Sequence, residues 1–442
     1  MQRFRFSLYL VSLFLTGALA VAGCGGSSVA GSTSTSTGGS GSSTSNVMAI
    51  SVNGGPTLNL PGGGIYPNGA FASATICAPG STTDCATVDG LLVDTGSTGL
   101  RVLQSAISSL NLPAVNASNG SAAYDCVSFV DDSFMWGPVQ NADVTLGEQT
   151  ATNLPIQVIS ASADVPSTCS NGSNMNEDTL DTLGANGILG VGNERTDCFY
   201  EGASVCSPSS GLSSPPYPAY YTCSGASCNP AFVATNSQVA NPVALFPSDN
   251  NGVIVELPAV SGSAASVSGS LVFGIGTRSN NQLPSSATIF TMTCDFFTTT
   301  FSGQTYGITN PTTCAGPASF IDSGSNGLYF PDAANIPLCP TNTAAGDLSS
   351  FYCPASTESF SATQLGASGT SKSVSFNVAN TESLFTSPAT ESDAALAGLA
   401  GTNPSGSGFD WGLPFFYGIN LYSSIDGQTM PSGTPAAPWW AY

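Results

Sequence analysis

Two short segments of the sequence carry aspartates in a setting that suits acid–base chemistry. Residues 92–102 read LVDTGSTGLRV and residues 320–330 read FIDSGSNGLYF. Counted from Asp94 and Asp322, five of nine positions are identical, and an apolar pair precedes each aspartate. An apolar run that enters Asp-[Thr/Ser]-Gly predicts a buried strand ending in a tight turn, where glycine permits unusual backbone angles. Asp94 and Asp322 are therefore the candidate catalytic residues.

The chain contains no histidine. This absence excludes Ser-His-Asp and Cys-His catalysis and every imidazole zinc site. Any chemistry must come from carboxylates, hydroxyls, thiols or the backbone, and we expect neither a metal nor another cofactor.

A second pair of matching segments follows the two aspartates at similar intervals. Residues 187–190 read GILG, and residues 409–412 read FDWG. Two halves that each contain a carboxylate turn and a later apolar-Gly element indicate an internal duplication. Asp410 is a charged residue where an apolar one is expected, and we interpret it as a turn or hydrogen-bonded strand-end carboxylate in preference to a catalytic group.

These motifs resemble the two Asp-Thr/Ser-Gly-Thr/Ser segments of the pepsin-like aspartic peptidases, each of which is followed by an apolar-apolar-Gly element. Residues 269–274 and 412–418 look like two further segments of the second half of that family. The chain is similar to a bacterial group of pepsin-like lipoproteins, over roughly residues 70–430. The resemblance implies an all-β, bilobal acid-protease fold with two related six-stranded-type β lobes and a cleft between them.

The resemblance also implies the activity of an aspartic endopeptidase. The two carboxylates would share one proton, activate a water molecule and donate to the peptide carbonyl oxygen. Hydroxyls of Thr95 and Ser323 would tie the two turns together, and those of Ser97 and Ser325 would orient the carboxylates. The implied supporting residues of the active site are Thr95, Gly96, Ser97, Ser323, Gly324 and Ser325.

Two positions depart from the family pattern. The hairpin expected to cover the cleft lies near residues 126–137, and Phe129 or Trp136 would stand in for the family's flap tyrosine. Arg101 occupies the position where the family usually has a tryptophan, and a cation beside the pair would favour ionised carboxylates. No Lys or Arg occurs between Gly25 and Arg101, so we expect no basic pro-segment.

The N-terminal residues read as an export signal. Residues 1–23 combine Arg3 and Arg5 with a short apolar core. Residues 21–24, which read VAGC and end in Cys24, resemble a bacterial lipobox. The resemblance implies a lipid on Cys24 that anchors the protein to the cell envelope, in the outer membrane, with residues 24–46 as a Gly/Ser/Thr tether. An N-terminal lobe at 47–250 and a C-terminal lobe at 251–442 would follow.

Twelve cysteines remain besides Cys24. An even number in an exported chain predicts disulfides, because that compartment is oxidising. The natural candidates are the close neighbours Cys77/Cys85, Cys223/Cys228 and Cys339/Cys353, although spacing alone leaves the connectivity open.

Composition supports the fold class and excludes one class of partner. Only 7% of the 442 residues are charged, while Gly (50) and Pro (29) are plentiful, which is typical of short strands joined by many turns. The formal charge of −21 excludes nucleic acid as a partner, since the surface repels phosphates. We expect a monomer that takes a peptide or protein substrate.

Two alternatives stay open at this point. The first is a catalytically inactive pepsin-fold lipoprotein that binds a peptide, glycan or envelope partner. The second is a disulfide-rich β surface protein in which both motifs are simple Asp-Gly turns.

Overall fold

The computed structural model describes residues 45–60, 63–129, 131–160, 165–173, 175–200, 203–204, 206–207, 210, 219–311, 314–331, 335–403 and 408–442. The signal peptide, Cys24 and residues 25–44 of the tether lie outside these described residues. Within them, no helix is long and apolar enough to cross a membrane.

The chain is mostly β with few helices, as its composition predicts. Strand β22 (Ser371–Val378) shows why: its three apolar residues alternate with Ser and Asn, and only the apolar ones are buried. The helices of the described residues are short, with at most six residues each: α1 (Ser167–Ser170), α2 (Leu180–Leu183), α3 (Thr381–Thr386) and the 3-10 turns η1 (Pro56–Asn59), η2 (Gln104–Ile107), η4 (Thr235–Ser237), η5 (Val243–Leu245) and η6 (Leu413–Phe416).

One large sheet of 15 strands runs through the whole molecule. In spatial order its strands are β12 (Ser227–Pro230), β11 (Tyr220–Ser224), β5 (Ala123–Ser128), β6 (Phe134–Leu146), β7 (Gln149–Ile159), β4 (Thr98–Leu103), β8 (Gly187–Val191), β3 (Cys85–Asp94), β2 (Tyr66–Cys77), β1 (Val47–Gly54), β15 (Val267–Phe273), β13 (Gly252–Glu256), β26 (Asn420–Ser424), β27 (Trp439–Ala441) and β16 (Ile289–Thr291).

Four smaller sheets complete the described structure. They contain β18 (Gln304–Tyr306), β17 (Thr298–Phe301), β21 (Glu358–Leu365) and β22; β19 (Phe320–Ile321), β25 (Asp410–Trp411), β20 (Leu328–Tyr329) and β24 (Ala400–Gly401); β10 (Ala203–Ser204) with β9 (Phe199–Tyr200); and β14 (Ser263–Ala264) with β23 (Ala395–Leu396).

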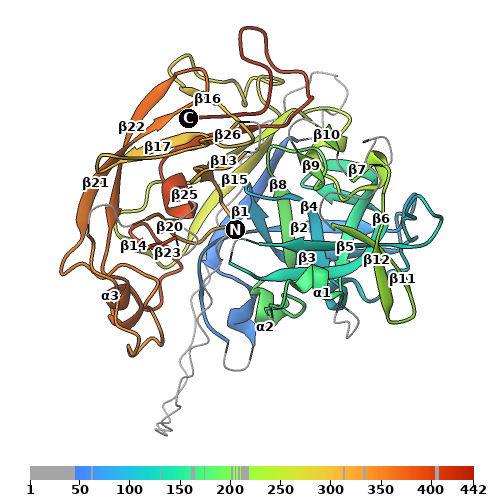
Figure 1. Ribbon diagram of the computed structural model, residues 1–442, viewed down its shortest axis with the longest axis horizontal. Coiled ribbons are helices and arrows are strands. Elements are labelled where there is room, and N and C mark those ends of the chain that lie inside the picture. The colour runs from blue at the N-terminus through green and yellow to red at the C-terminus, as the bar shows by residue number, and fades with distance from the viewer. Residues whose placement is uncertain are drawn as a thin grey trace, which may run out of the picture.

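Strands of the first and second halves of the chain lie on opposite sides of the molecule (Figure 1). Strands β2 to β12 are on one side, and β16 to β25 are on the other. Strand β1 joins the two, because it pairs with β2 along one edge and with β15 along the other, where Val47 faces Val272. The N-terminal strand therefore makes the large sheet continuous across both halves.

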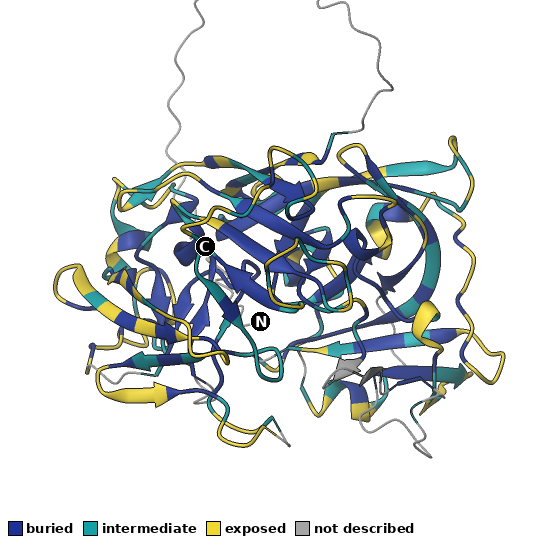
Figure 2. Ribbon diagram, turned by 90° about the horizontal axis from the view of Figure 1, so that it is seen from above, coloured by how far each residue is buried: buried dark blue, intermediate teal, exposed yellow. Residues whose placement is uncertain are grey.

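Buried residues follow the strands, and exposed residues gather at the peripheral turns (Figure 2). In the second half, a stack of aromatic rings forms the core behind β20 and β25. Phe330 and Phe409 stack with their centroids 4.9 Å apart, and Phe301, Phe376 and Trp411 surround them. Rings of this size hold both strands firmly in place.

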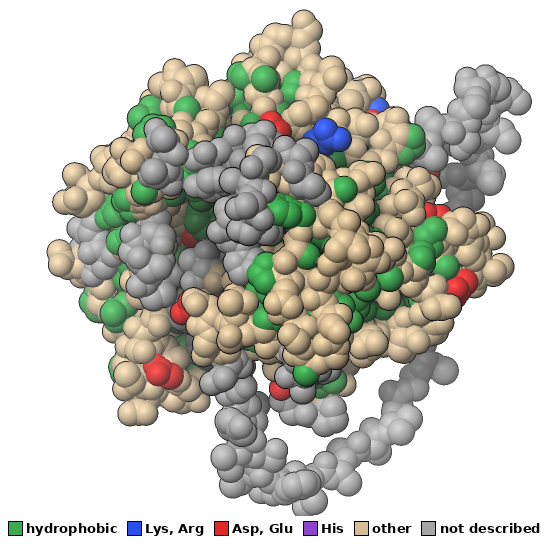
Figure 3. Space-filling model, turned by 45° about the vertical axis from the view of Figure 1, so that its right-hand side comes forward, with side chains coloured by type: hydrophobic (Ala, Val, Ile, Leu, Met, Phe, Trp, Pro, Cys, Tyr) green, Lys and Arg blue, Asp and Glu red, His purple; other side chains and the backbone are tan. Residues whose placement is uncertain are grey.

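Few charges reach the surface. Figure 3 shows a face on which acidic side chains are scattered, basic ones are very few, and hydrophobic patches lie among uncharged polar groups and backbone. A surface of this kind agrees with a chain in which only 7% of residues are charged.

Six disulfides link the twelve cysteines. The three pairs expected from their spacing are confirmed: Cys77–Cys85, Cys223–Cys228 and Cys339–Cys353. The first two of these lie directly opposite each other on paired strands. The other three are Cys126–Cys169, Cys198–Cys206 and Cys294–Cys314.

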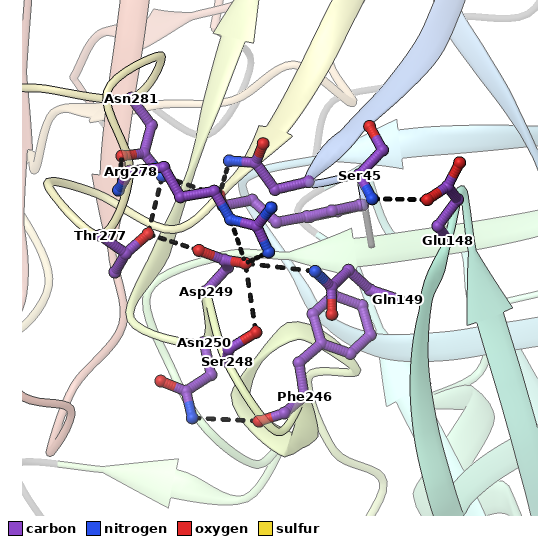
Figure 4. Close-up of polar contacts among 12 residues, drawn as sticks. Ser45, Glu148, Gln149, Phe246, Ser248, Asp249, Asn250, Thr277, Arg278 and Asn281 are labelled. Atoms are coloured by element: carbon purple, nitrogen blue, oxygen red, sulfur yellow. Dashed lines mark hydrogen bonds and ion pairs between the residues drawn. The ribbon is translucent and has the colours of Figure 1, made fainter. Parts of the chain in front are cut away.

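A polar network connects the start of β7 with the loop that follows β15 (Figure 4). Its centre is Asp249, which accepts hydrogen bonds from Arg278, Thr277 and Gln149. Burial acts to raise the pKa of Asp249, but the bonds from Arg278 and Thr277 outweigh it and lower that pKa. An ionised Asp249 thus ties elements of the two halves together.

Candidate active site

Asp94 ends strand β3, whose last residues are entirely buried. Val93 lies opposite Leu189 in the parallel pair β3–β8, and Asp94 lies opposite Gly190. Strand β4 then returns antiparallel to β8. The apolar run of the motif therefore becomes a buried strand, and the turn after it brings Asp94 to the end of that strand.

The second half repeats this arrangement residue by residue. The same three cross-strand pairs form in each half: Val93–Leu189, Leu100–Leu189 and Arg101–Ile188 in the first, and Ile321–Trp411, Leu328–Trp411 and Tyr329–Asp410 in the second. Asp322 thus stands at the end of β19 as Asp94 stands at the end of β3. The duplication seen in the sequence extends to the hydrogen-bond register.

Each carboxylate receives the same two hydrogen bonds from its own turn. The N–H of Gly96 donates to Oδ1 of Asp94 (2.9 Å), and the hydroxyl of Ser97 donates to its Oδ2 (2.5 Å). In the other turn, the Gly324 N–H and the Ser325 hydroxyl bond to Oδ1 and Oδ2 of Asp322 at 2.7 and 2.8 Å. Donors on both oxygens fix the plane of each carboxylate.

Crossed hydrogen bonds hold the two turns together. The Ser323 hydroxyl donates to the carbonyl of Val93 (2.8 Å) and accepts from the N–H of Thr95 (3.1 Å). The Thr95 hydroxyl accepts from the N–H of Ser323 (3.0 Å) and lies 3.4 Å from the carbonyl of Ile321. Each hydroxyl therefore bonds to the backbone of the opposite motif.

The two carboxylates lie close together, and glycine makes the approach possible. A Cβ on Gly96 would lie 2.5 Å from Cγ of Asp322. A Cβ on Gly324 would lie 2.6 Å from Oδ1 of Asp94 and 3.1 Å from Oδ1 of Asp322. The two Oδ1 atoms therefore lie less than about 6 Å apart, so a single water molecule can bridge them. Any larger residue at these two glycines would collide with a carboxylate.

A third carboxyl lies at the site, and its proximity was missed in the sequence. Asp410 is entirely buried in β25, and its Oδ2 lies 2.6 Å from the hydroxyl of Ser325. Burial, followed by the charge of Asp322, raises the pKa of Asp410 well above its ordinary value. Asp410 is a hydrogen-bonded strand carboxylate, as expected, but its partner belongs to the candidate active site. The sequence signal that could have revealed this contact is the charged residue Asp410 within an otherwise apolar-Gly element.

Contrary to expectation, the charge of Arg101 is directed at carboxylates other than the aspartate pair. Its guanidinium is buried and forms ion pairs with Asp125 and Asp197, as well as a hydrogen bond to Gln157. The expectation that its charge acts on Asp94 and Asp322 is corrected, because two other carboxylates neutralise it. Burial raises the pKa of Asp125 to about 7, although Arg101 opposes the rise.

The expected hairpin is formed by β5 and β6, in which Ser128 pairs with Phe134. Phe129 lies in its turn and bonds through its N–H to the carbonyl of Ser133 (2.8 Å). Trp136, by contrast, is buried between Tyr124 and Tyr221. It is a core residue of the hairpin base, so of the two aromatic candidates only Phe129 lies at the turn.

The fold and the site together define a mostly β protein in which two repeated strand–turn motifs bring two carboxylates close together. The chain belongs to the family described as "Protein of unknown function (DUF3443)", whose model matches residues 42–442. No curated protein matches the chain. Among solved structures it is similar to an aspartic proteinase from Irpex lacteus, with 14% identity, coverage of 85% of this chain and 93% of that one, and a TM-score of 0.41.

Proposed function

We propose that the protein is an aspartic-type endopeptidase that hydrolyses peptide bonds with the pair Asp94 and Asp322. The observation that carries the proposal is the geometry of the pair. Two buried carboxylates from equivalent turns lie beside a common point, and each has a glycine N–H on one oxygen and a serine hydroxyl on the other.

The mechanism follows from the closeness of the two carboxylates. Two such groups do not both ionise readily, so the pair holds one shared proton and titrates as a unit. The ionised carboxylate takes a proton from a water molecule as the water attacks the peptide carbonyl carbon, and the protonated one donates to the carbonyl oxygen. The tetrahedral intermediate then collapses, and a proton passes to the leaving amine. The enzyme forms no covalent bond to the substrate.

The finer architecture that suits this function is two related lobes with a substrate cleft between them. The repeated strand register and the separation of the two halves in Figure 1 support it. Burial raises the pKa of Tyr329 of the second half, and the charge of Asp131, in the turn of the β5–β6 hairpin, adds to the rise. The hairpin therefore reaches toward the opposite half, as a flap over a cleft would. A co-crystal with a statine-type peptide analogue should place the analogue between the halves, under this hairpin.

The test is turnover of a mixed internally quenched peptide library by the full chain, from about pH 3 to 7, the range in which such pairs share a proton. Asp94→Asn and Asp322→Asn should each lower kcat/KM by about 10³-fold or more, because neither variant can form the charged and protonated pair. The matched control is Asp89→Asn, an exposed residue of the same strand β3, which should leave the activity unchanged.

A folded wild-type protein that cleaves no peptide at any of these pH values would contradict the proposal. It would favour the inactive binding protein instead. Retained activity in either aspartate variant would contradict it as well.

A further inference from the structure

The hydroxyl of Ser325 contacts two carboxyl groups, whereas the matching hydroxyl of Ser97 bonds to Asp94. The Ser325 hydroxyl lies 2.8 Å from Oδ2 of Asp322 and 2.6 Å from Oδ2 of Asp410. A hydroxyl has a single proton and can donate it to only one of these oxygens. The other short contact must then be a donation from a protonated carboxyl to the serine oxygen.

Asp410 is the carboxyl that holds this proton. It is entirely buried, and its Oδ1 has no hydrogen-bond partner among the described residues. None of the ion pairs formed by the described residues involves it. A buried ionised carboxylate with no cation and no donor besides the Ser325 hydroxyl would be very costly, whereas a neutral acid that donates one bond is not.

The two carboxylates of the pair act on Asp410 in the same direction. Asp322 and Asp94 bring negative charge toward it, and Tyr329, its direct partner on β20, brings a neutral phenol. Burial and the two aspartates raise the pKa of Asp410 well above its ordinary value and outweigh the bond from Ser325, which acts to lower it. Burial and the two carboxylates therefore favour the protonated form of Asp410.

We propose that Asp410 is a positioning residue of the aspartate pair: as an uncharged acid it donates to Ser325 and so directs the serine hydroxyl onto Asp322. The proton chain runs from Asp410 through Ser325 to Oδ2 of Asp322. This role rests on the proposed peptidase function. It makes the pair asymmetric, because the matching position in the first half is Ile188, which offers no such bond to Ser97.

Two substitutions distinguish the hydrogen-bond donor function of Asp410 from the volume that its side chain fills. Asp410→Asn keeps the shape, cannot ionise and can donate through its amide. Asp410→Ile installs the residue of the first half and removes the donor. We expect the Asn variant to keep kcat/KM within about threefold of wild type. The Ile variant should lose about tenfold or more in kcat with little change in KM, because misplaced catalytic groups cost rate more than binding.

The pH profile provides the readout that a purely structural role would not affect. If Asp410 is neutral in the working enzyme, the profile of Asp410→Asn should overlay that of wild type. If Asp410 is ionised instead, the Asn variant removes a negative charge beside Asp322, and both limbs should move to lower pH. Such a movement, an Asn variant as impaired as the Ile variant, or a fully active Ile variant would overturn the proposal.

A measurement without turnover separates failure of this inference from failure of the proposed function. Infrared difference spectra of wild type minus Asp410→Asn at neutral pH should show the carbonyl band of one protonated carboxylic acid. The band supports the proton chain even if wild type hydrolyses no peptide, an outcome that would end the peptidase proposal alone. Absence of the band overturns the inference whatever the activity. Circular dichroism of each variant verifies that it is folded.

Discussion

At the scale of single residues, the molecule is organised around hydrogen bonds that each motif makes to the other. Asp94 and Asp322 are held by their own turns, but Thr95 and Ser323 bond to the backbone of the opposite turn. Thr95 and Ser323 are buried, so their hydroxyls cannot readily exchange these backbone partners for water. Their bonds therefore decide both the stability of the centre and the distance between the two carboxylates.

Ser323→Ala should destabilise the protein by about 1–3 kcal/mol, because the buried Thr95 N–H and Val93 carbonyl lose their partner. Thr95→Val should cost a similar amount. Urea unfolding of the two single variants and the double variant gives the coupling free energy, expected to be about 0.5–3 kcal/mol.

Thr87→Val, the same chemical change at an exposed position of β3, is the control and should stay within about 0.5 kcal/mol of wild type. Strictly additive effects of Ser323→Ala and Thr95→Val would show that the two hydroxyls do not act as one unit.

At the scale of elements, the buried Arg101 links three strands of the first half. It lies on β4 and bonds to Asp125 of β5 and Gln157 of β7, while Asp197 completes its partners. Tyr220 of β11 donates to Asp197 and joins the same group. Strand β4, which follows the Asp94 turn, and strand β5 of the hairpin are therefore tied by charge as well as by apolar packing.

Arg101→Met should destabilise the protein by about 3–5 kcal/mol at neutral pH, because it leaves two carboxylates buried without their cation. The loss should shrink as the pH falls, since Asp125, with a pKa of about 7, and Asp197, whose pKa is also raised, then become neutral. Chemical unfolding at several pH values measures this. A loss that is the same at acid and neutral pH would show that packing, not charge, is what Arg101 supplies.

At the scale of the whole molecule, burial of carboxyl groups favours acid conditions. Among the residues that the structure describes, six carboxyls have a raised pKa, namely Asp125, Glu194, Asp197, Glu256, Asp295 and Asp410. Between its unfolded and folded pKa, such a group holds its proton in the folded state and loses it in the unfolded one. Stability is then complete at low pH and falls as the pH rises. Asp249, with its lowered pKa, acts in the opposite sense.

The free energy of unfolding should therefore be highest in mild acid and decrease toward alkaline pH. Glu194 contributes strongly: burial and the neighbouring Asp295 and Asp426 raise its pKa from 4.5 to about 10. Glu194→Gln should flatten the decrease by up to about 1.4 kcal/mol per pH unit. Urea unfolding across this range tests it, and stability that rises from acid to neutral pH would refute the expectation.

Several features could be predicted from local sequence alone. The two motifs predict buried strands that end in glycine turns, because an apolar run and a glycine determine the conformation of the few residues around them. The mostly β character follows from composition, and three disulfides follow from short spacing. Even the equivalence of residues 187–190 and 409–412 was visible as a repeat and reappears in the strand register.

Contacts between distant segments were decided only by the tertiary structure. Arg101 follows Asp94 closely in sequence, yet its charge is met by Asp125 and Asp197, which other parts of the chain bring to it. Asp410 lies far from Asp322 along the chain, yet the pairing of β19 with β25 brings it to Ser325. Burial and electrostatic partners are properties of the packed molecule. Local pattern therefore identifies the residues able to do chemistry, and folding decides which of them meet.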